Sequence, residues 1–169
     1  VKMEISCLSL SEPFAPRHIS SMIHERFPEA DEDCSCTINI VSPERTFLEK
    51  AFLLNEEFQK AKPRTKRLSR HYYDLEKLMD TEFGKKALVN HELYDHIIEH
   101  RQQFYNLHYV DYEKNHSANI SFYPPQELIE AFRADYANMT TAFIFKEALA
   151  FDDLMKRIAE LQERFHNMK

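Results

Sequence analysis

Residues 42–60 read SPERTFLEKAFLLNEEFQK, and this stretch decides the fold of the chain. Ser42 can cap a helix, and Pro43 is tolerated in the first helical turn, where its missing N–H would have no intrahelical partner. The apolar residues that follow have the spacing of a single helix face: Phe47, Ala51, Leu54 and Phe58. We therefore predict an amphipathic helix over about residues 42–60 that buries this face.

The same helical periodicity continues toward the C-terminus. We expect helices over about residues 68–79, from Asn90 to Phe104, from Pro124 to about Asn138, and over about residues 151–166. A basic connector, residues 60–67, separates the first two helices. The residues expected in the core are Leu68, Tyr72, Leu75, Met79, Leu93, Ile97, Ile98, Phe104, Leu154, Ile158, Leu161 and Phe165.

The N-terminal part of the chain differs in pattern. Apolar and polar residues alternate from Val1 to Cys7, as in a half-buried strand, and residues 37–41 predict a second short strand. Between them we expect a turn at Pro13 and Pro16 and a short helix over about residues 17–27. The predicted fold class is α+β and predominantly helical, with short N-terminal strands followed by a helical body.

Composition excludes several classes of protein. Gly84 is the single glycine, which disfavours glycine-rich phosphate loops and barrels, and the net charge of −6 argues against a generally basic nucleic-acid coat. Three cysteines, two of them one residue apart, do not form a disulfide framework, so we expect a reducing cytoplasm. No run of about 18 apolar residues is present, so we expect no membrane partner.

Four charged residues recur at helical spacing from the end of the connector into the predicted helix: Arg67, Arg70, His71 and Asp74. Arginine suits phosphate, and an adjacent carboxylate can hold a metal or orient a hydroxyl, so this face is a candidate phosphate-binding and acid–base cluster. The alternative is a solvated stripe in which Asp74 pairs with Arg70 one turn away.

Two further basic features flank this cluster. Thr46 and Lys50 share a face near the start of the first helix and could hold an anion there, whereas Arg45 has Glu49 one turn away; such helix starts are also common without any ligand. The connector and the start of the next helix carry six basic residues and no acid: Lys60, Lys62, Arg64, Lys66, Arg67 and Arg70. This run is a candidate RNA or phosphate contact, and the alternative is a soluble loop.

The stretches Ser42–Lys50 (SPERTFLEK) and Arg67–Leu75 (RLSRHYYDL) resemble the bacterial AbiEii/AbiGii nucleotidyltransferase toxins, and weaker similarity extends over nearly the whole chain. The resemblance implies transfer of a nucleotide from an NTP to an acceptor, with RNA, often tRNA, as a known acceptor class. It also implies Mg²⁺, a type IV toxin role and an antitoxin protein partner. Carried over onto this sequence, the catalytic residues are Lys50 and Asp74, with nucleotide or phosphate contacts from Arg45, Thr46, Arg67, Arg70 and His71.

The sequence departs from the family pattern at its start. In the family, a Gly-Ser (or Gly-Gly) turn and an Asp-x-Asp/Glu metal pair stand upstream; this sequence lacks the turn, and Asp31-Glu32-Asp33 has polar flanks that indicate a solvated loop. We therefore expect the C-terminal part of a longer nucleotidyltransferase, inactive by itself. Residues 1–41 would end the nucleotidyltransferase core, and residues 42–169 would form a helical C-terminal domain. Glu4 is a candidate metal ligand or, alternatively, an exposed strand residue.

Two other interpretations remain open on the sequence. The chain could be a non-catalytic helical module that contacts RNA through the connector or an antitoxin through its helices. It could also be a family member that keeps the fold without the chemistry. The RNA-binding residues expected on either the enzymatic or the binding interpretation are Lys60, Lys62, Arg64 and Lys66.

Overall fold

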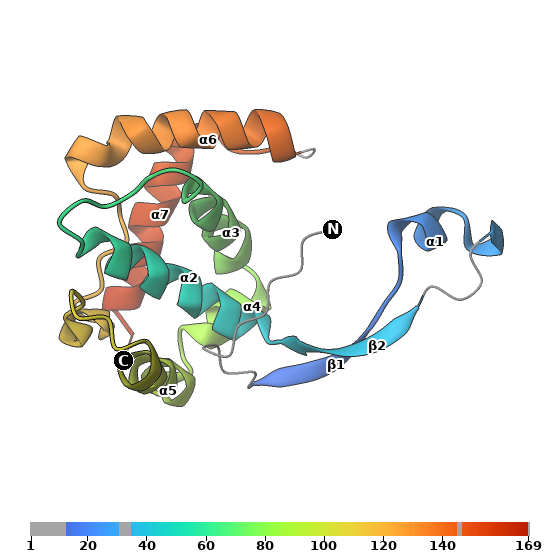
Figure 1. Cartoon of the computed structure of the whole chain (residues 1–169), viewed down its shortest axis with the longest axis horizontal. Helices are drawn as coiled ribbons and strands as arrows, with labels where there is room; N and C mark the ends of the chain where they lie inside the picture. Colours follow the sequence, from blue (N-terminus) through green and yellow to red (C-terminus); the bar gives the residue numbers. More distant parts are fainter. Residues whose placement is uncertain (1–12, 31–34, 145–146, 169) are drawn as a thin grey trace. The chain divides into compact units, whose positions relative to one another are not determined.

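The computed structural model describes residues 13–30, 35–144 and 147–168. The expected strand Val1–Cys7, with Glu4, and the acidic loop Asp31–Asp33 lie outside these residues. The chain forms two compact units, divided between Ser42 and Pro43 (Figure 1).

The first unit is built on a two-stranded antiparallel sheet. Strand β1 (Phe14–Ile19) pairs with β2 (Cys36–Val41), with Phe14 opposite Val41 at one end of the ladder and Ile19 opposite Cys36 at the other. A short helix, α1 (Met22–Arg26), and a 3₁₀ turn (Pro28–Ala30) follow β1. The side chain of Ser21 caps α1 by accepting from the amide of His24 at 3.0 Å.

Strand pairing corrects part of the sequence prediction in this unit. The strand expected over residues 37–41 is confirmed. The expected short helix forms as α1, but it starts at Met22 and not at about residue 17, and the turn expected at Pro13 and Pro16 is wrong, because β1 occupies residues 14–19. Pro16 lies opposite Asn39 in this ladder. Each strand of a two-stranded sheet is an edge strand, and proline is tolerated there because its missing N–H can face away from the partner.

The second unit is helical, and the mostly helical α+β fold class is confirmed. The long α2 (Pro43–Phe58) packs against three of the other helices and carries a face of fully buried residues. The elements that follow it are α3 (Ser69–Met79), α4 (Glu82–Ala87), α5 (His91–His100) with a π-helical turn (Arg101–Tyr105), 3₁₀ turns at Tyr112–Asn115 and Gln126–Leu128, α6 (Ile129–Phe143) and α7 (Phe151–His166). The largest apolar side chains of the core are Tyr72, Phe47, Phe52, Phe122, Phe132 and Phe165.

Helical periodicity predicted the buried residues well, with one exception. Every core residue named from the sequence in α3 and α7 is buried, as are those of α5. Phe104, assigned to the same face as Ile97, is instead 55% exposed. The reason is the π-helical turn after His100, which inserts extra residues into the helix and rotates its continuation relative to a regular α-helix.

Gly84 is required by close packing inside α4, a helix that the sequence analysis missed. A Cβ atom at this position would lie 2.3 Å from the carbonyl oxygen of Leu78, which is backbone and cannot move aside cheaply. In an open helix Gly→Ala stabilises by about 1 kcal/mol. Here we expect the opposite sign: Gly84→Ala should lower the free energy of unfolding by about 2 kcal/mol or more, as overpacked sites do.

Urea unfolding followed by circular dichroism measures this effect. The control is Lys85→Ala, at an exposed position of the same helix, which should leave the midpoint nearly unchanged. A Gly84→Ala variant as stable as the wild type would show that position 84 of α4 has room for a Cβ atom beside the end of α3.

Candidate functional site

Lys50 and Asp74, from two different helices, meet in an ion pair. The Nζ atom of Lys50 on α2 lies 2.7 Å from Oδ2 of Asp74 on α3. Their side chains are 21% and 40% exposed, so the pair is partly buried and still open to solvent. Among the described residues Asp74 pairs with Lys50 and not with Arg70, so the solvated stripe considered from the sequence does not form in that way. The two residues expected to be catalytic are thus brought together.

His71 lies one turn before Asp74 and faces the protein interior. The residue is 8% exposed, and its Nδ1 atom has no hydrogen-bond partner among the residues that the structure describes. Burial, together with the positive charges of Lys50 and Arg70, lowers the pKa of His71 to about 4. His71 is therefore a neutral imidazole at pH 7, which can exchange a hydrogen bond but adds no positive charge for a phosphate.

This neutral state predicts a specific dependence of stability on pH. Between pH 6.5, the ordinary pKa, and pH 4, the unfolded chain protonates His71 and the folded protein does not. Stability should therefore fall on acidification, and His71 should account for about 2 kcal/mol of the loss between pH 7 and pH 5. Urea unfolding of the wild type and of His71→Gln at both pH values isolates this contribution as a difference. Equal losses in the two proteins would contradict the neutral state.

The other residues expected on α2 separate onto two faces. Thr46 is exposed one turn before Lys50, on the same side of the helix, and so lies where a ligand of Lys50 could reach it. Arg45 is only 2% exposed, and its guanidinium donates to Glu49 at 3.1 Å, as the sequence predicted. A buried, paired arginine is a structural group in this arrangement, so the geometry favours Thr46 over Arg45 as a phosphate contact.

A buried network of charged and amide groups, missed from the sequence, anchors α2. Arg101, in the π-helical turn, donates to both carboxylate oxygens of Glu56, at 2.7 and 2.5 Å, and also pairs with Glu49. Asn115 donates to Glu56 at 3.0 Å and accepts from Asn55 at 2.7 Å. The network ties the helix that bears Lys50 to two distant segments. Its signal in the sequence was the polar run Asn55-Glu56-Glu57 within an apolar helix.

The basic connector is partly neutralised by its own helix. The buried carboxylate of Glu57 accepts from the backbone amide of Arg64 at 3.0 Å and pairs with Lys60 at 2.7 Å. Burial by itself would raise the pKa of Glu57, but these hydrogen bonds and positive charges lower it below its ordinary value. Four other basic side chains in this region are exposed and remain available to a ligand: Lys62, Lys66, Arg67 and Arg70.

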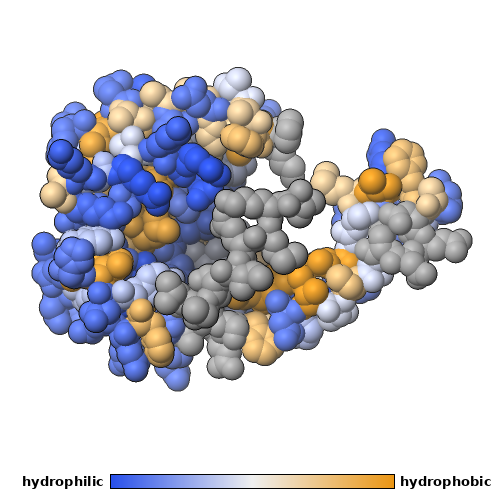
Figure 2. Space-filling view, viewed as in Figure 1, coloured by the Kyte–Doolittle hydropathy of each residue, from blue (hydrophilic) through white to orange (hydrophobic). Residues whose placement is uncertain are grey.

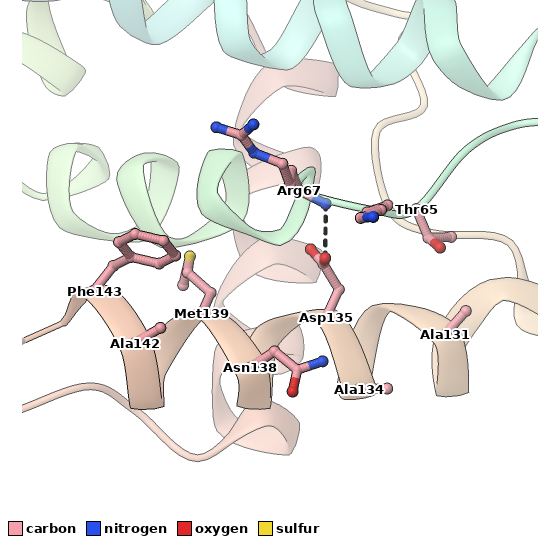
Figure 3. A pocket seen from close by; sticks show the side chains of 10 residues that line it. Thr65, Arg67, Ala131, Ala134, Asp135, Asn138, Met139, Ala142 and Phe143 are labelled. Carbon is pink, nitrogen blue, oxygen red and sulfur yellow. Dashed lines mark hydrogen bonds between the residues drawn. The ribbon is translucent and has the colours of Figure 1, made fainter. Parts of the chain in front are cut away.

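Asp135 on α6 sets the point at which α3 begins. Its carboxylate accepts from the amide of Arg67 at 2.6 Å, from the amide of Ser69 at 3.0 Å and from the Ser69 hydroxyl at 2.5 Å (Figure 3). Burial alone would raise the pKa of Asp135, yet these hydrogen bonds together lower it. Arg67 has a φ of 63° and so lies before the helix, as the predicted helix start at about residue 68 implies. It therefore does not share the helical face on which it was predicted to lie with Arg70, His71 and Asp74. Local sequence gave no cap signal at this start, because the capping group comes from a distant helix.

The described residues of this site supply only some of the ligands that a divalent metal ion needs. Among residues 13–30, 35–144 and 147–168 no group of three or more His, Cys, Asp or Glu side chains is placed to hold one. Asp74 is a partly exposed carboxylate, and Mg²⁺ is commonly held by one or two carboxylates plus substrate phosphates. Asp74 therefore fits as one ligand of a shared site. Glu4, the other candidate, lies outside the described residues.

Comparison with known proteins shows the family of the chain. The model of one protein family, the nucleotidyl transferase AbiEii toxin of type IV toxin–antitoxin systems, matches residues 1–157. No curated protein and no solved structure matches the chain. None of the described helices is long and apolar enough to cross a membrane. Because the family model spans nearly the whole sequence, the chain belongs to the AbiEii family of nucleotidyltransferase toxins of type IV toxin–antitoxin systems.

Proposed function

We propose that this protein transfers a nucleotide from an NTP to an RNA acceptor, with tRNA as the first acceptor class to test. The observation that carries the proposal is the Lys50–Asp74 pair, which brings together an ammonium and a carboxylate at 2.7 Å in a position open to solvent. An ammonium there can bind an NTP phosphate, and the released carboxylate can hold a metal ion or orient a hydroxyl. The family context adds an antitoxin protein as a proposed partner and the cytoplasm as the proposed location.

In the proposed reaction, an acceptor hydroxyl oxygen forms a bond to the α-phosphorus of the NTP and loses its proton to solvent. The bond from that phosphorus to the pyrophosphate group breaks, and pyrophosphate leaves with the bonding electron pair. Lys50 binds the phosphate oxygens and thereby leaves Asp74 free for a second contact. Thr46 can donate its hydroxyl to the same phosphates. Mg²⁺, when bound, would neutralise charge on the NTP phosphates. Positioning and charge stabilisation suffice for this chemistry, since no covalent intermediate with the protein is needed.

We also propose that two parts of the sequence contribute differently to the active site. Residues 1–41 would belong to a nucleotidyltransferase core and residues 42–169 to the helical domain that completes its site. The Gly-Ser turn of the family is not among the 169 residues of this sequence, and the one Asp-x-Asp match, Asp31-Glu32-Asp33, has polar flanks, so we propose that the principal metal carboxylates lie outside this sequence. On this proposal the 169-residue chain binds substrates but does not transfer nucleotides by itself, and Glu4 is an additional candidate ligand.

Nucleotide transfer by the protein produced from its own gene tests the proposal. The protein is incubated with each α-labelled NTP, Mg²⁺ and total tRNA, and the products are separated by denaturing electrophoresis. We expect label in the RNA with at least one NTP. Label only in protein, or none with any NTP, would reject RNA as the acceptor.

The exposed basic side chains of the connector predict a strong salt dependence of RNA binding. About three or four phosphate contacts to a single strand give a log–log slope of affinity against salt of about −2 to −3, because each contact releases counterions. Replacing Lys62, Arg64 and Lys66 together with alanine should flatten this slope with little effect on NTP binding. The triple substitution removes the ion pair between the Arg64 side chain and Glu57. The backbone amide of residue 64 still donates to Glu57 and Lys60 still pairs with it, so the connector should keep its shape.

Fluorescence anisotropy across a salt series measures the slope. A matched control removes three lysines of the helical unit at other positions, Lys85, Lys86 and Lys156, and should leave the slope unchanged. Equal slopes for the wild type and the connector variant would identify the connector as a solubilising loop.

A further inference from the structure

A hollow of about 570 Å³ lies between the connector and α6, and its lining includes neither Lys50 nor Asp74 (Figure 3). One wall is formed by residues 65–67 of the connector. The other is one face of α6: Ala131, Ala134, Asp135, Asn138, Met139, Ala142 and Phe143. This size is in the range of pockets that hold a small molecule or a single nucleotide.

The two walls are fixed relative to each other. The carboxylate of Asp135 on α6 accepts from the backbone amides of Arg67 and Ser69, so the connector cannot swing away from α6 without breaking these hydrogen bonds. The same bonds direct the negative charge of Asp135 at the backbone. The groove is therefore preformed, and its one carboxylate is already occupied.

The walls and the ends of the groove differ in chemistry. The alanines on the α6 wall leave this wall open and apolar. The ring of Phe143 lies at one end of the groove and is 74% exposed. Lys66 lines the opposite wall and is exposed, with Lys62 and Arg70 exposed nearby in the sequence. Arg67 lines the groove with its backbone, and its guanidinium points away from α6 (Figure 3).

The surface around the groove favours an anionic occupant with an apolar, flat body. The helical unit is mostly hydrophilic in Figure 2, with apolar residues interrupting that surface where α6 runs. Single-stranded nucleic acids bind where a base can stack on an aromatic ring and a phosphate can meet a cation, and the groove offers Phe143 at one end and Lys66 on the connector wall. A protein partner would need about 800 Å² of contact surface on this side, far more than one narrow groove supplies.

We propose that this groove seats one unpaired base of the acceptor RNA, with a neighbouring phosphate on Lys66. The inference rests on the proposed function, since it assigns a place to the acceptor of that reaction. It explains why an exposed apolar ring and an open alanine wall adjoin the basic connector. It also makes the site selective for unpaired RNA, because a base held in a duplex is stacked and cannot enter.

Filling the groove tests the proposal directly. Ala134→Leu places a larger side chain in the groove, whereas Ala137→Leu adds the same atoms to another exposed alanine of α6 that does not line it. Binding of a short fluorescein-labelled single-stranded RNA to the full chain is measured by anisotropy, beside the same strand annealed to its complement. Loss of one stacked base predicts a roughly five- to one-hundredfold lower affinity of Ala134→Leu for the single strand.

The control variant and the duplex should both be unaffected. Phe143→Ala should weaken single-strand binding as well, and 4-thiouridine in the strand should photo-crosslink to the peptide that contains Met139 and Phe143. The inference would be overturned if Ala134→Leu kept its affinity for the single strand or if the crosslinks mapped elsewhere. The groove would then be a candidate binding site for a protein partner. Such a result would not touch the proposed function, which the transfer assay decides separately.

Discussion

Replacing Lys50 with alanine, or Asp74 with asparagine, should lower nucleotide transfer by about 10²- to 10³-fold, the loss typical of removing one charge-stabilising group from an active site. Lys50→Ala removes the ammonium proposed for the NTP phosphates, and Asp74→Asn removes the carboxylate while keeping its shape. The rate of labelled transfer by the protein produced from its own gene, and its toxicity in cells at matched expression, measure the effect. Transfer at the wild-type rate in either variant would contradict the site assignment.

Folding should survive both changes. The ion pair is partly exposed, and such pairs contribute at most about 1 kcal/mol to stability. Lys77→Ala is the matched control, because Lys77 pairs with the neighbouring Glu76 on the same helix α3, at 3.0 Å, and should leave transfer unchanged. A charge swap, Lys50→Asp with Asp74→Lys, separates the roles further. If the pair is catalytic, the swap variant keeps an ion pair but does not transfer nucleotides. If the swap variant regains transfer, the pair is only structural.

Replacing Arg101 with methionine should cost about 3–5 kcal/mol of stability, the largest effect that we expect from a single substitution. Arg101 is buried and pairs with Glu49 and Glu56. Methionine would leave the buried carboxylate of Glu56 with an uncompensated charge, whereas Glu49 would keep its ion pair with Arg45. Because the network holds α2, the variant should also lose RNA and NTP binding when it unfolds. Urea unfolding at pH 7 measures the change.

A surface arginine provides the comparison for this prediction. Arg133 pairs with Glu130 and Asp152 at the surface, so Arg133→Met should leave the midpoint of urea unfolding nearly unchanged. Adding Glu56→Leu to Arg101→Met should recover part of the loss, since a buried charge pair can be replaced by apolar groups at little cost. Equal stabilities of Arg101→Met and Arg133→Met would show that the carboxylates reach solvent when Arg101 is removed.

The sequence by itself determined the helices and most of their buried faces. The helix over residues 151–166 and the core residues of α3 were predicted correctly because the 3.6-residue spacing of apolar side chains is a local property of the chain. Local patterns gave the wrong secondary structure at residues 14–19, where pairing with β2 decided the conformation. They also gave the wrong burial for Phe104, because a π-helical turn breaks the periodicity there.

The sequence also identified the family, and its motifs made Lys50 and Asp74 the catalytic candidates, but they did not show how these two residues are held. Their contact at 2.7 Å depends on the packing of α2 against α3, and the neutral state of His71 depends on burial. Asp135 caps a helix that starts far from it in the chain, and Arg101 reaches two glutamates of α2. These interactions join residues that no local pattern relates, because they form only when the helices pack, and the tertiary structure alone therefore decided them.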